Sequence, residues 1–225
     1  MQRNEIVQLS VPLRVLADPF PYILDYARGK RVLNVGASGG VEHYLPMQRE
    51  SWLHHRLGKV AAELVGIDID AESVSFAAQH GAHLLISDCE TCSFPQTFDL
   101  IVMSDVIEHV NSPLRAIENL TKQLSPNGRL LITTPNPNHY GLVMRAWLGR
   151  RTDVYYDHVC EFLPEHFQVI SHRLGLKLID VVFFSHLDTR SFGNRLKSHL
   201  ARLLGSLVPR CHGALMVALQ PEKKS

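Results

Sequence analysis

The sequence predicts an α/β protein built on a mostly parallel sheet, and three observations support this class. Short apolar runs bounded by turn residues alternate with helical patterns along most of the chain. One such run, residues 31–35, breaks into a glycine-rich turn at 36–40. A later run, 64–68, ends in the carboxylate of Asp68. Strands that alternate with helices favour a parallel sheet with helices on both faces.

The expected elements follow in chain order. Residues 1–30 read as a helical lead-in interrupted by prolines. Strands are expected at about 31–35, 64–68, 83–87, 98–103, 128–134, 176–184 and 213–219, each a β-branched or apolar run between turn residues. Helices are expected at 52–63, 71–79, 112–124 and 161–174, with Asp70 as the cap of the second. Two segments lie outside this scheme: 41–58, which lengthens the helix after the glycine turn and contains Trp52, His54 and His55, and 186–210.

Composition narrows the class of protein. A chain of 225 residues suits one domain spanning 1–225. The net charge of +1 gives no general attraction to nucleic acid. No apolar run approaches the ~20 residues of a membrane span, and the first residues lack the apolar core of a signal peptide. We therefore expect a cytoplasmic protein without a nucleic-acid partner.

Four cysteines indicate neither a disulfide framework nor a paired zinc site, and no metal site is expected. Cys89 and Cys92 form a lone C-x-x-C pair. Such a pair can serve redox chemistry or bind a metal. Because no second pair exists, chance spacing on a loop is the favoured interpretation.

The glycine turn and Asp68 together are typical of a nucleoside site in a Rossmann-like sheet. Small residues let the backbone approach the ligand, and an acid at the end of the next strand accepts from ribose hydroxyls. The dinucleotide fingerprint G-x-G-x-x-G fails, because Ser38 and Val41 occupy two of its glycine positions. A P-loop is also excluded, since no Gly-Lys-Ser/Thr follows. A nicotinamide-dependent oxidoreductase is accordingly disfavoured.

The segment 31–40 resembles motif I of the class I S-adenosyl-L-methionine (SAM) dependent methyltransferases, V-L-D-x-G-x-G-x-G. Segment 98–110, FDLIVMSDVIEHV, is similar to the corresponding segment of type-11 and type-23 methyltransferases. Residues 124–136 resemble the L-x-P-G-G…T-x-P-N stretch of the same family. This resemblance implies a seven-stranded sheet whose last strand runs antiparallel between its neighbours, and SAM as the cofactor.

The resemblance also implies roles in cofactor binding. The turn would underlie the methionine part, Asp68 would accept from the ribose hydroxyls, and Asp88 would accept from the adenine amino group. Asn34 stands where the family has an acid, and Ser38 where it has a glycine, which implies altered cofactor contacts. The residues expected at the cofactor are Asn34, Gly36, Ala37, Ser38, Gly40, Asp68, Ile69, Asp88, Cys89 and Ser104.

Two histidines are candidates for catalysis. His109 follows the fourth predicted strand in the family's EH position, and an imidazole suits removal of a hydroxyl proton. His158 lies in 155–165, which resembles a segment of methyltransferases linked to surface-glycan modification. Either histidine could instead be structural: His109 as a cap, His158 as the anchor of a lid. Asp157 could orient its neighbour His158.

The expected activity is methyl transfer, at oxygen, to a small-molecule, sugar, glycan or lipid-linked acceptor. An alternative is a quinone or other aromatic hydroxyl. A third is a catalytically weak SAM-binding partner subunit, which Asn34 and Ser38 would favour. Segment 186–210 carries leucines at helical spacing and several basic residues. It is expected to pack on the sheet or in a homodimer, or else to contact a membrane through 190–210.

Overall fold

The computed structural model describes residues 5–152, 154–185, 202, 203, 205 and 207–222. Its elements in chain order are β1 (Leu13–Val15), α1 (Phe20–Ala27), β2 (Arg31–Val35), α2 (Val41–Tyr44), η1 (Arg49–Ser51), α3 (Leu53–Gly58), β3 (Glu63–Asp68), α4 (Ala71–Gln79), β4 (Leu85–Ile86), β5 (Phe98–Ser104), α5 (Pro113–Lys122), β6 (Leu124–Pro135), α6 (Tyr140–Trp147), α7 (Pro164–Leu174), β7 (Leu176–Phe184), η2 (Pro209–Cys211) and β8 (Ala214–Pro221). Among these residues no helix is long and apolar enough to cross a membrane.

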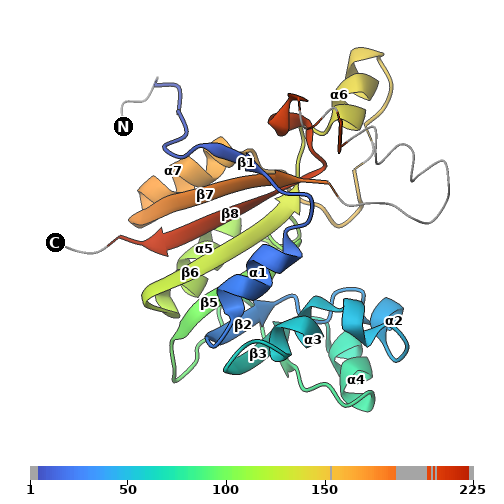
Figure 1. The fold of residues 1–225 in the computed structure, drawn as a ribbon, viewed down its shortest axis with the longest axis vertical. Coiled ribbons are helices and arrows are strands. Elements are labelled where there is room, and N and C mark those ends of the chain that lie inside the picture. Colours follow the sequence, from blue (N-terminus) through green and yellow to red (C-terminus); the bar gives the residue numbers. More distant parts are fainter. Residues whose placement is uncertain (1–4, 153, 186–201, 204, 206, 223–225) are drawn as a thin grey trace.

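One sheet runs through the molecule in the order β1-β7-β8-β6-β5-β2-β3-β4 (Figure 1). Strand β8 is antiparallel to both of its neighbours, β6 and β7, and the other pairs are parallel. The seven predicted strands and the antiparallel last strand are confirmed. Strands β3 and β4 are added on one side of β2, and β5 and β6 on the other. Because β2, β3 and β5 are parallel, their carboxyl ends lie at the same edge of the sheet, and such sheets bind ligands at the point where the strand order changes direction.

Helices cover both faces, as the alternation of strands and helices predicted. Buried residues of α5 and α7 pack with one set of strand side chains that includes Leu33 and Ile101. Their strand neighbours Val32 and Leu100 point to the other face, against α1 and α3. Figure 1 shows α1 crossing in front of the sheet and α5 behind it. Successive side chains of a central strand point to opposite faces, and both faces are buried. The central strands are therefore continuous apolar runs in the sequence.

The lead-in 1–30 differs from its prediction, because its described residues, 5–30, are helical only over α1 and contribute an eighth strand, β1. Leu13 to Val15 pair in parallel with Val181 to Phe183 at the sheet edge. Three residues are too few to show a strand period in sequence, so the pairing partner decides this conformation.

Several helix boundaries also differ from the prediction. The predicted helix 52–63 ends at Gly58, because the chain turns there and enters β3 at Glu63. Segment 41–58 is not one lengthened helix but the short pieces α2, η1 and α3. Helix α6 was not predicted. Most of segment 186–210 lies outside the described residues, and of the leucines that predicted a helix there only Leu203 and Leu207 are described, both helical and exposed.

Candidate cofactor and acceptor site

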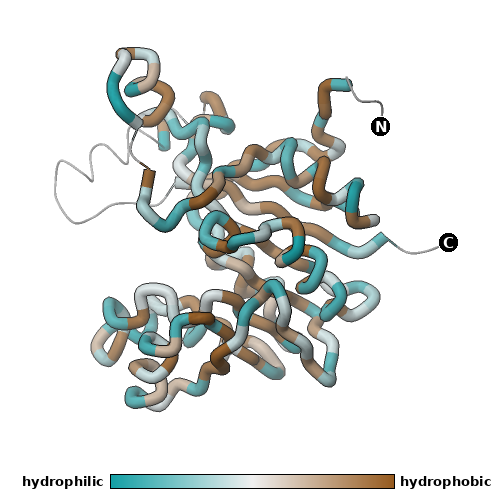
Figure 2. Tube along the Cα trace, turned by 180° about the vertical axis from the view of Figure 1, so that it is seen from behind, coloured by the Kyte–Doolittle hydropathy of each residue, from teal (hydrophilic) through white to brown (hydrophobic). Residues whose placement is uncertain are grey.

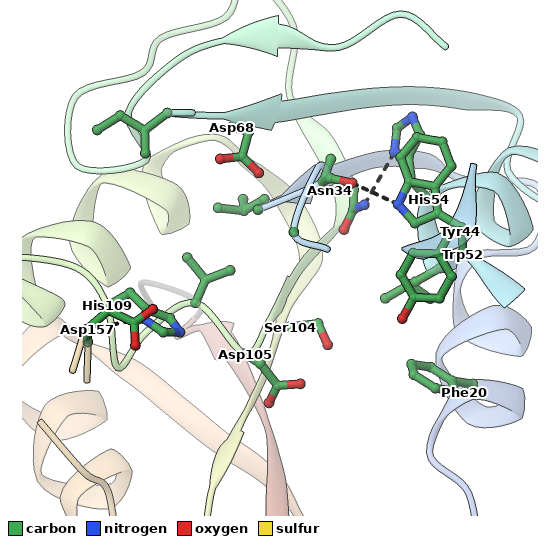
Figure 3. A pocket seen from close by; sticks show the side chains of 17 residues that line it. Phe20, Asn34, Tyr44, Trp52, His54, Asp68, Ser104, Asp105, His109 and Asp157 are labelled. Carbon is green, nitrogen blue, oxygen red and sulfur yellow. Dashed lines mark hydrogen bonds and ion pairs between the residues drawn. The ribbon is translucent and has the colours of Figure 1, made fainter. Parts of the chain in front are cut away.

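Two adjoining cavities lie at the carboxyl ends of β2, β3 and β5. The larger has a volume of about 540 Å³ and the smaller about 110 Å³. Both are lined by Val35, Gly36, Asp68, Ile69, Val106 and His109. Figure 3 shows the larger cavity, with Asp68, Ser104 and Asp105 on strand ends and His109 with Asp157 to one side. The shared lining makes the two cavities one elongated site with Asp68 near its middle.

The glycine turn begins where buried strand β2 ends. Gly36 has φ +69°, and a Cβ at this position would collide with the side chain of Val106. Glycine is therefore required here both for its conformation and for space. The Ala37 N–H donates to the Ile67 carbonyl at 3.0 Å, which ties the turn to β3.

Asn34 and His54 form a buried pair beside this turn. The Asn34 amide nitrogen lies 3.3 Å from His54 Nδ1. Burial lowers the pKa of His54 to about 4, so the neutral ring can accept from the amide. Trp52 supports the same turn, because its indole N–H donates to the Ala37 carbonyl at 3.0 Å. Segment 41–58 thus brings Trp52 and His54 to the site, whereas His55 pairs with Glu50 on the surface.

The two acids that follow β3 do different things. Asp68 Oδ2 accepts from the Ser38 backbone N–H at 2.9 Å, and Oδ1 accepts from the Asp70 N–H at 3.2 Å. Asp70 is the N-cap of α4 and accepts from the Glu72 N–H at 3.0 Å. The predicted capping role of Asp70 is confirmed, and Asp68 faces the cavities.

The smaller cavity brings Asp88 and Cys89 next to Ile69. Asp88 Oδ1 accepts from the Glu90 N–H at 2.8 Å, which shapes the loop. Both thiols of the C-x-x-C pair are buried and free. Burial raises the pKa of Cys89 to about 12 and that of Cys92 to about 11. Such thiols stay protonated and are poor nucleophiles and ligands, which favours the chance interpretation of this pair.

Asp105, which sequence reasoning missed, lines the larger cavity. It has φ +51°, an uncommon conformation for a residue with a side chain. Thr133 supports it twice, because its carbonyl accepts from the Asp105 N–H at 3.0 Å and its hydroxyl donates to Asp105 Oδ1 at 3.1 Å. Its place directly after the end of β5, at the ligand-binding edge, is the signal that could have found it.

His109 lines both cavities and pairs with Asp157. Its Nδ1 lies 3.2 Å from Asp157 Oδ2 and 3.2 Å from the Asp157 carbonyl oxygen. Asp157 itself lines the larger cavity. The expectation that Asp157 orients His158 is therefore wrong for this geometry, because its carboxylate contacts His109 instead. Side chains of adjacent residues rarely face each other, whereas His109, in the loop after β5, lies opposite Asp157.

His158 stands behind His109, edge-on, with the two ring centres 4.7 Å apart. The segment that carries it is fixed to the β5 loop, since the Val159 N–H donates to the Glu108 carbonyl at 2.8 Å. Of the predicted site residues, Ser38, Gly40 and His158 line neither cavity, and the others line at least one.

Glu108 is a buried carboxyl group under these histidines. Its Oε2 accepts from the Thr134 hydroxyl at 3.0 Å, and its Oε1 has no partner among the described residues. Burial raises the pKa of Glu108 to about 7. One ligand atom each of Glu108, His109 and His158 lie within 4.8 Å of one another, so this cluster could hold a metal ion. Residue spacing alone gave no sign of it.

Comparison with known proteins identifies the family. The type-23 family model, described as a methyltransferase domain, matches residues 8–181. The chain belongs to the type-23 methyltransferase family. It is a class I SAM-dependent enzyme, as the motifs predicted.

Curated relatives share part of this methyltransferase. It is 32% identical over 127 residues to the mitochondrial ubiquinone biosynthesis O-methyltransferase of Rattus norvegicus, covering 52% of this chain and 34% of the rat protein. It is 29% identical over 128 residues to the ubiquinone biosynthesis O-methyltransferase of Aliivibrio fischeri strain MJ11, covering 52% and 50%. The chain thus spans a third to a half of the length of these relatives.

Solved structures share the fold. The N-methyltransferase NodS from Bradyrhizobium japonicum WM9 superposes with a TM-score of 0.57 at 15% identity, over 90% of this chain and 94% of NodS. The magnesium protoporphyrin IX methyltransferase ChlM from Synechocystis PCC 6803, with bound S-adenosylhomocysteine (SAH), gives a TM-score of 0.60 at 14% identity, over 90% and 82%. At such identities the likeness shows the fold alone.

The residues present fit SAM, the cofactor of this methyltransferase. The site is elongated, and an acid lies between its two cavities. Gly36 lines both cavities and carries no side chain, so a ligand can approach the backbone of the turn closely.

Proposed function

We propose that this methyltransferase methylates a hydroxyl oxygen of a small-molecule acceptor, with His109 as the general base. The observation that carries this is the pairing of His109 Nδ1 with Asp157 Oδ2 at 3.2 Å, with both side chains lining the larger cavity. When Nδ1–H donates to Asp157, Nε2 keeps a lone pair for the hydroxyl proton. Asp157 also stabilises the imidazolium ion that forms.

Bound SAM supplies an electrophilic methyl group, so the protein's task is to position the acceptor and remove its proton. We assign the ribose contact to Asp68. The adenine contacts go to Asp88, Cys89 and Ile69, which line the smaller cavity. The methionine side goes to Asn34, Gly36, Ala37, Ser38 and Gly40, and Ser104 to the reacting end. Most of these residues line the two joined cavities, which supports the assignment, whereas Ser38 and Gly40 are assigned from the motif alone.

For the acceptor, an aromatic hydroxyl is the first candidate. Two of the relatives are named ubiquinone biosynthesis O-methyltransferases, and they support this class. Phe20, Tyr44 and Trp52 also line the larger cavity, which suits a flat apolar compound. The second candidate is a sugar or lipid-linked hydroxyl. Its support is the 155–165 segment, whose resemblance is to glycan-modifying enzymes and whose Asp157 lines the cavity.

The test measures SAH release with a panel of catechols, other phenols and sugar acceptors. His109→Gln should lower kcat by about 10²–10⁴-fold while SAH affinity stays near the wild-type value. Asp157→Asn should lower kcat less and shift its pH profile. His158→Gln, which removes a ring outside both cavities, is the matched control and should keep most of the turnover. Full turnover by His109→Gln would contradict the proposal.

The cluster of Glu108, His109 and His158 offers a second use of the same histidine, as a metal ligand. A divalent ion there would occupy the lone pair that a base needs. Turnover that survives a chelator supports His109 as the base. Turnover that is lost with the chelator and restored by a divalent cation would indicate that His109 binds a metal ion and does not act as the base.

A further inference from the structure

Helix α6 presents an apolar surface that the other described residues leave exposed. None of its eight residues, all of them described, is buried. Four exposed apolar side chains gather on it and just after it: Val143 (49%), Met144 (54%), Trp147 (83%) and Leu148 (55%). In Figure 1 the helix stands away from the sheet. A surface helix normally turns its apolar stripe toward the core, so this stripe is available to an external partner.

The charge of α6 and of the turn directly after it is of one sign. Residues 139–152 include Arg145, Arg150 and Arg151 and contain no Asp or Glu. Arg150 and Arg151 are exposed in the turn that follows the helix. Figure 2 shows hydrophobic and hydrophilic positions side by side along this projecting segment. Apolar side chains flanked by basic ones are the composition of helices that lie in the interface of an anionic bilayer.

The exposed apolar surface continues from α6 toward the cavity. Val154, Tyr155, Tyr156 and Val159 are exposed by 62%, 75%, 106% and 62%. Tyrosine and tryptophan suit the boundary between water and hydrocarbon, since each has an apolar body and a polar end. Asp157, within this stretch, lines the larger cavity. The surface therefore borders the mouth of the site.

We propose that α6, with residues 148–152 and 154–159, forms a docking surface for an anionic lipid bilayer. Trp147 and Met144 enter the headgroup boundary, and Arg150 and Arg151 meet lipid phosphates. A second copy of the chain is a poorer occupant, because a two-fold contact through this surface would bring the arginines of both copies together. The surface also favours an acceptor that is itself held in the bilayer. This conclusion about the acceptor, unlike the docking surface, rests on the proposed function.

The test is co-sedimentation of the full chain with vesicles, without SAM or acceptor, so that its result is independent of activity. Vesicles of phosphatidylcholine alone are compared with vesicles that also contain phosphatidylglycerol. Wild-type protein should sediment with the anionic vesicles only, and less as salt rises. Arg150→Gln/Arg151→Gln should lower the partition coefficient about thirtyfold, because each basic residue near an anionic surface contributes ~1 kcal/mol to binding. Trp147→Ser should lower it as well.

The matched control is Arg28→Gln/Met47→Ser, which removes exposed basic and apolar side chains away from α6. It should sediment like the wild type. Because all these side chains are exposed, the variants should keep the wild-type circular dichroism spectrum and melting temperature. Absence of sedimentation at low salt, or sedimentation that both α6 variants retain, would overturn the proposal. A wild-type dimer that becomes monomeric in Trp147→Ser would instead assign the surface to a second copy.

Discussion

At the residue scale, two carboxylates only two positions apart illustrate how environment sets a role. Asp68 ends a strand and faces both cavities, whereas Asp70 caps α4. The difference arises because Asp68 still belongs to β3, while Asp70 has left the sheet and precedes the first free N–H groups of the helix. The pair therefore separates cofactor binding from helix stability experimentally.

Asp68→Ala should weaken SAH binding by about 1–3 kcal/mol, since it removes an ionised acceptor and leaves buried donors unpaired. Asp70→Ala should leave SAH affinity near the wild-type value but cost about 1 kcal/mol of folding free energy, the usual value for an N-cap. Titration calorimetry with SAH measures the first effect and urea denaturation the second. Equal SAH affinities of Asp68→Ala and wild type would refute the assignment of Asp68.

Glu108 predicts a pH dependence of stability. Its folded pKa, about 7, lies above its ordinary value of 4.5 because the carboxyl group is buried. The folded state therefore binds the proton more tightly than the unfolded state. The resulting stabilisation is complete below about pH 4.5 and is lost as the pH rises through about 7.

Glu108→Gln lacks this titration but keeps a similar shape. Between about pH 4.5 and pH 8, the wild-type unfolding free energy should fall relative to that of Glu108→Gln by up to about 3 kcal/mol. Urea denaturation of both proteins over a pH series measures the difference. Curves that stay parallel over the whole range would show that Glu108 does not titrate in this interval.

At the element scale, one carboxylate on β7 holds the N-terminal elements to the sheet. Asp180 Oδ2 accepts from Arg14 Nη1 on β1 at 2.6 Å and from the Tyr22 hydroxyl on α1 at 3.0 Å. The Asp180 side chain is only 12% exposed. Helix α1 also carries Phe20, which lines the larger cavity. The attachment of these two elements therefore affects both stability and the site.

Asp180→Ala should destabilise the fold by about 1–3 kcal/mol, because it leaves Arg14 and Tyr22 without their shared acceptor. Asp25→Ala, which removes an exposed carboxylate 3.6 Å from Arg28, is the matched control and should change stability by less than about 1 kcal/mol. Urea denaturation of the three proteins gives both values. Equal effects of the two substitutions would mean that Asp180 does not anchor these elements.

At the scale of the whole molecule, we propose that residues 1–225 form one cooperative domain. Two large clusters of buried side chains lie on opposite faces of the same sheet, and a third lies around α2 and α4. The third cluster contains Ala37 of the glycine turn and Trp52, so loss of this cluster would also open the cofactor site. The clusters share strands and turns and cannot separate without breaking the sheet.

A single domain predicts a single unfolding transition. Trp52 is buried and Trp147 is exposed, so tryptophan fluorescence should report mainly on the environment of Trp52. Its urea transition should coincide with that of far-ultraviolet circular dichroism, which follows all helices and strands. SAH at about a hundredfold excess over its Kd should move both curves together, by about 2.7 kcal/mol. Separate midpoints would indicate an independently unfolding part.

The features that could be predicted from the sequence are those that local chemistry controls. Strand order and helix order follow from apolar periodicity, the turn at Gly36 from its need for positive φ, and the role of Asp70 from its position before α4. The family motifs added the antiparallel β8 and the cofactor. The strands, the Gly36 turn and the Asp70 cap need only near neighbours in the chain, and the structure confirms them together with the antiparallel β8.

Contacts between residues that are distant in the sequence depend on how the elements pack in three dimensions. The pairing of His109 with Asp157 depends on how the segment after α6 docks on the β5 loop, and that of Asn34 with His54 on the entry of α3 beneath the turn. Strand β1 is too short to show a period, and the exposure of α6 depends on what else packs nearby. Local periodicity fixes how a side chain points from its own element, but the registers and docking of separate elements fix what it touches.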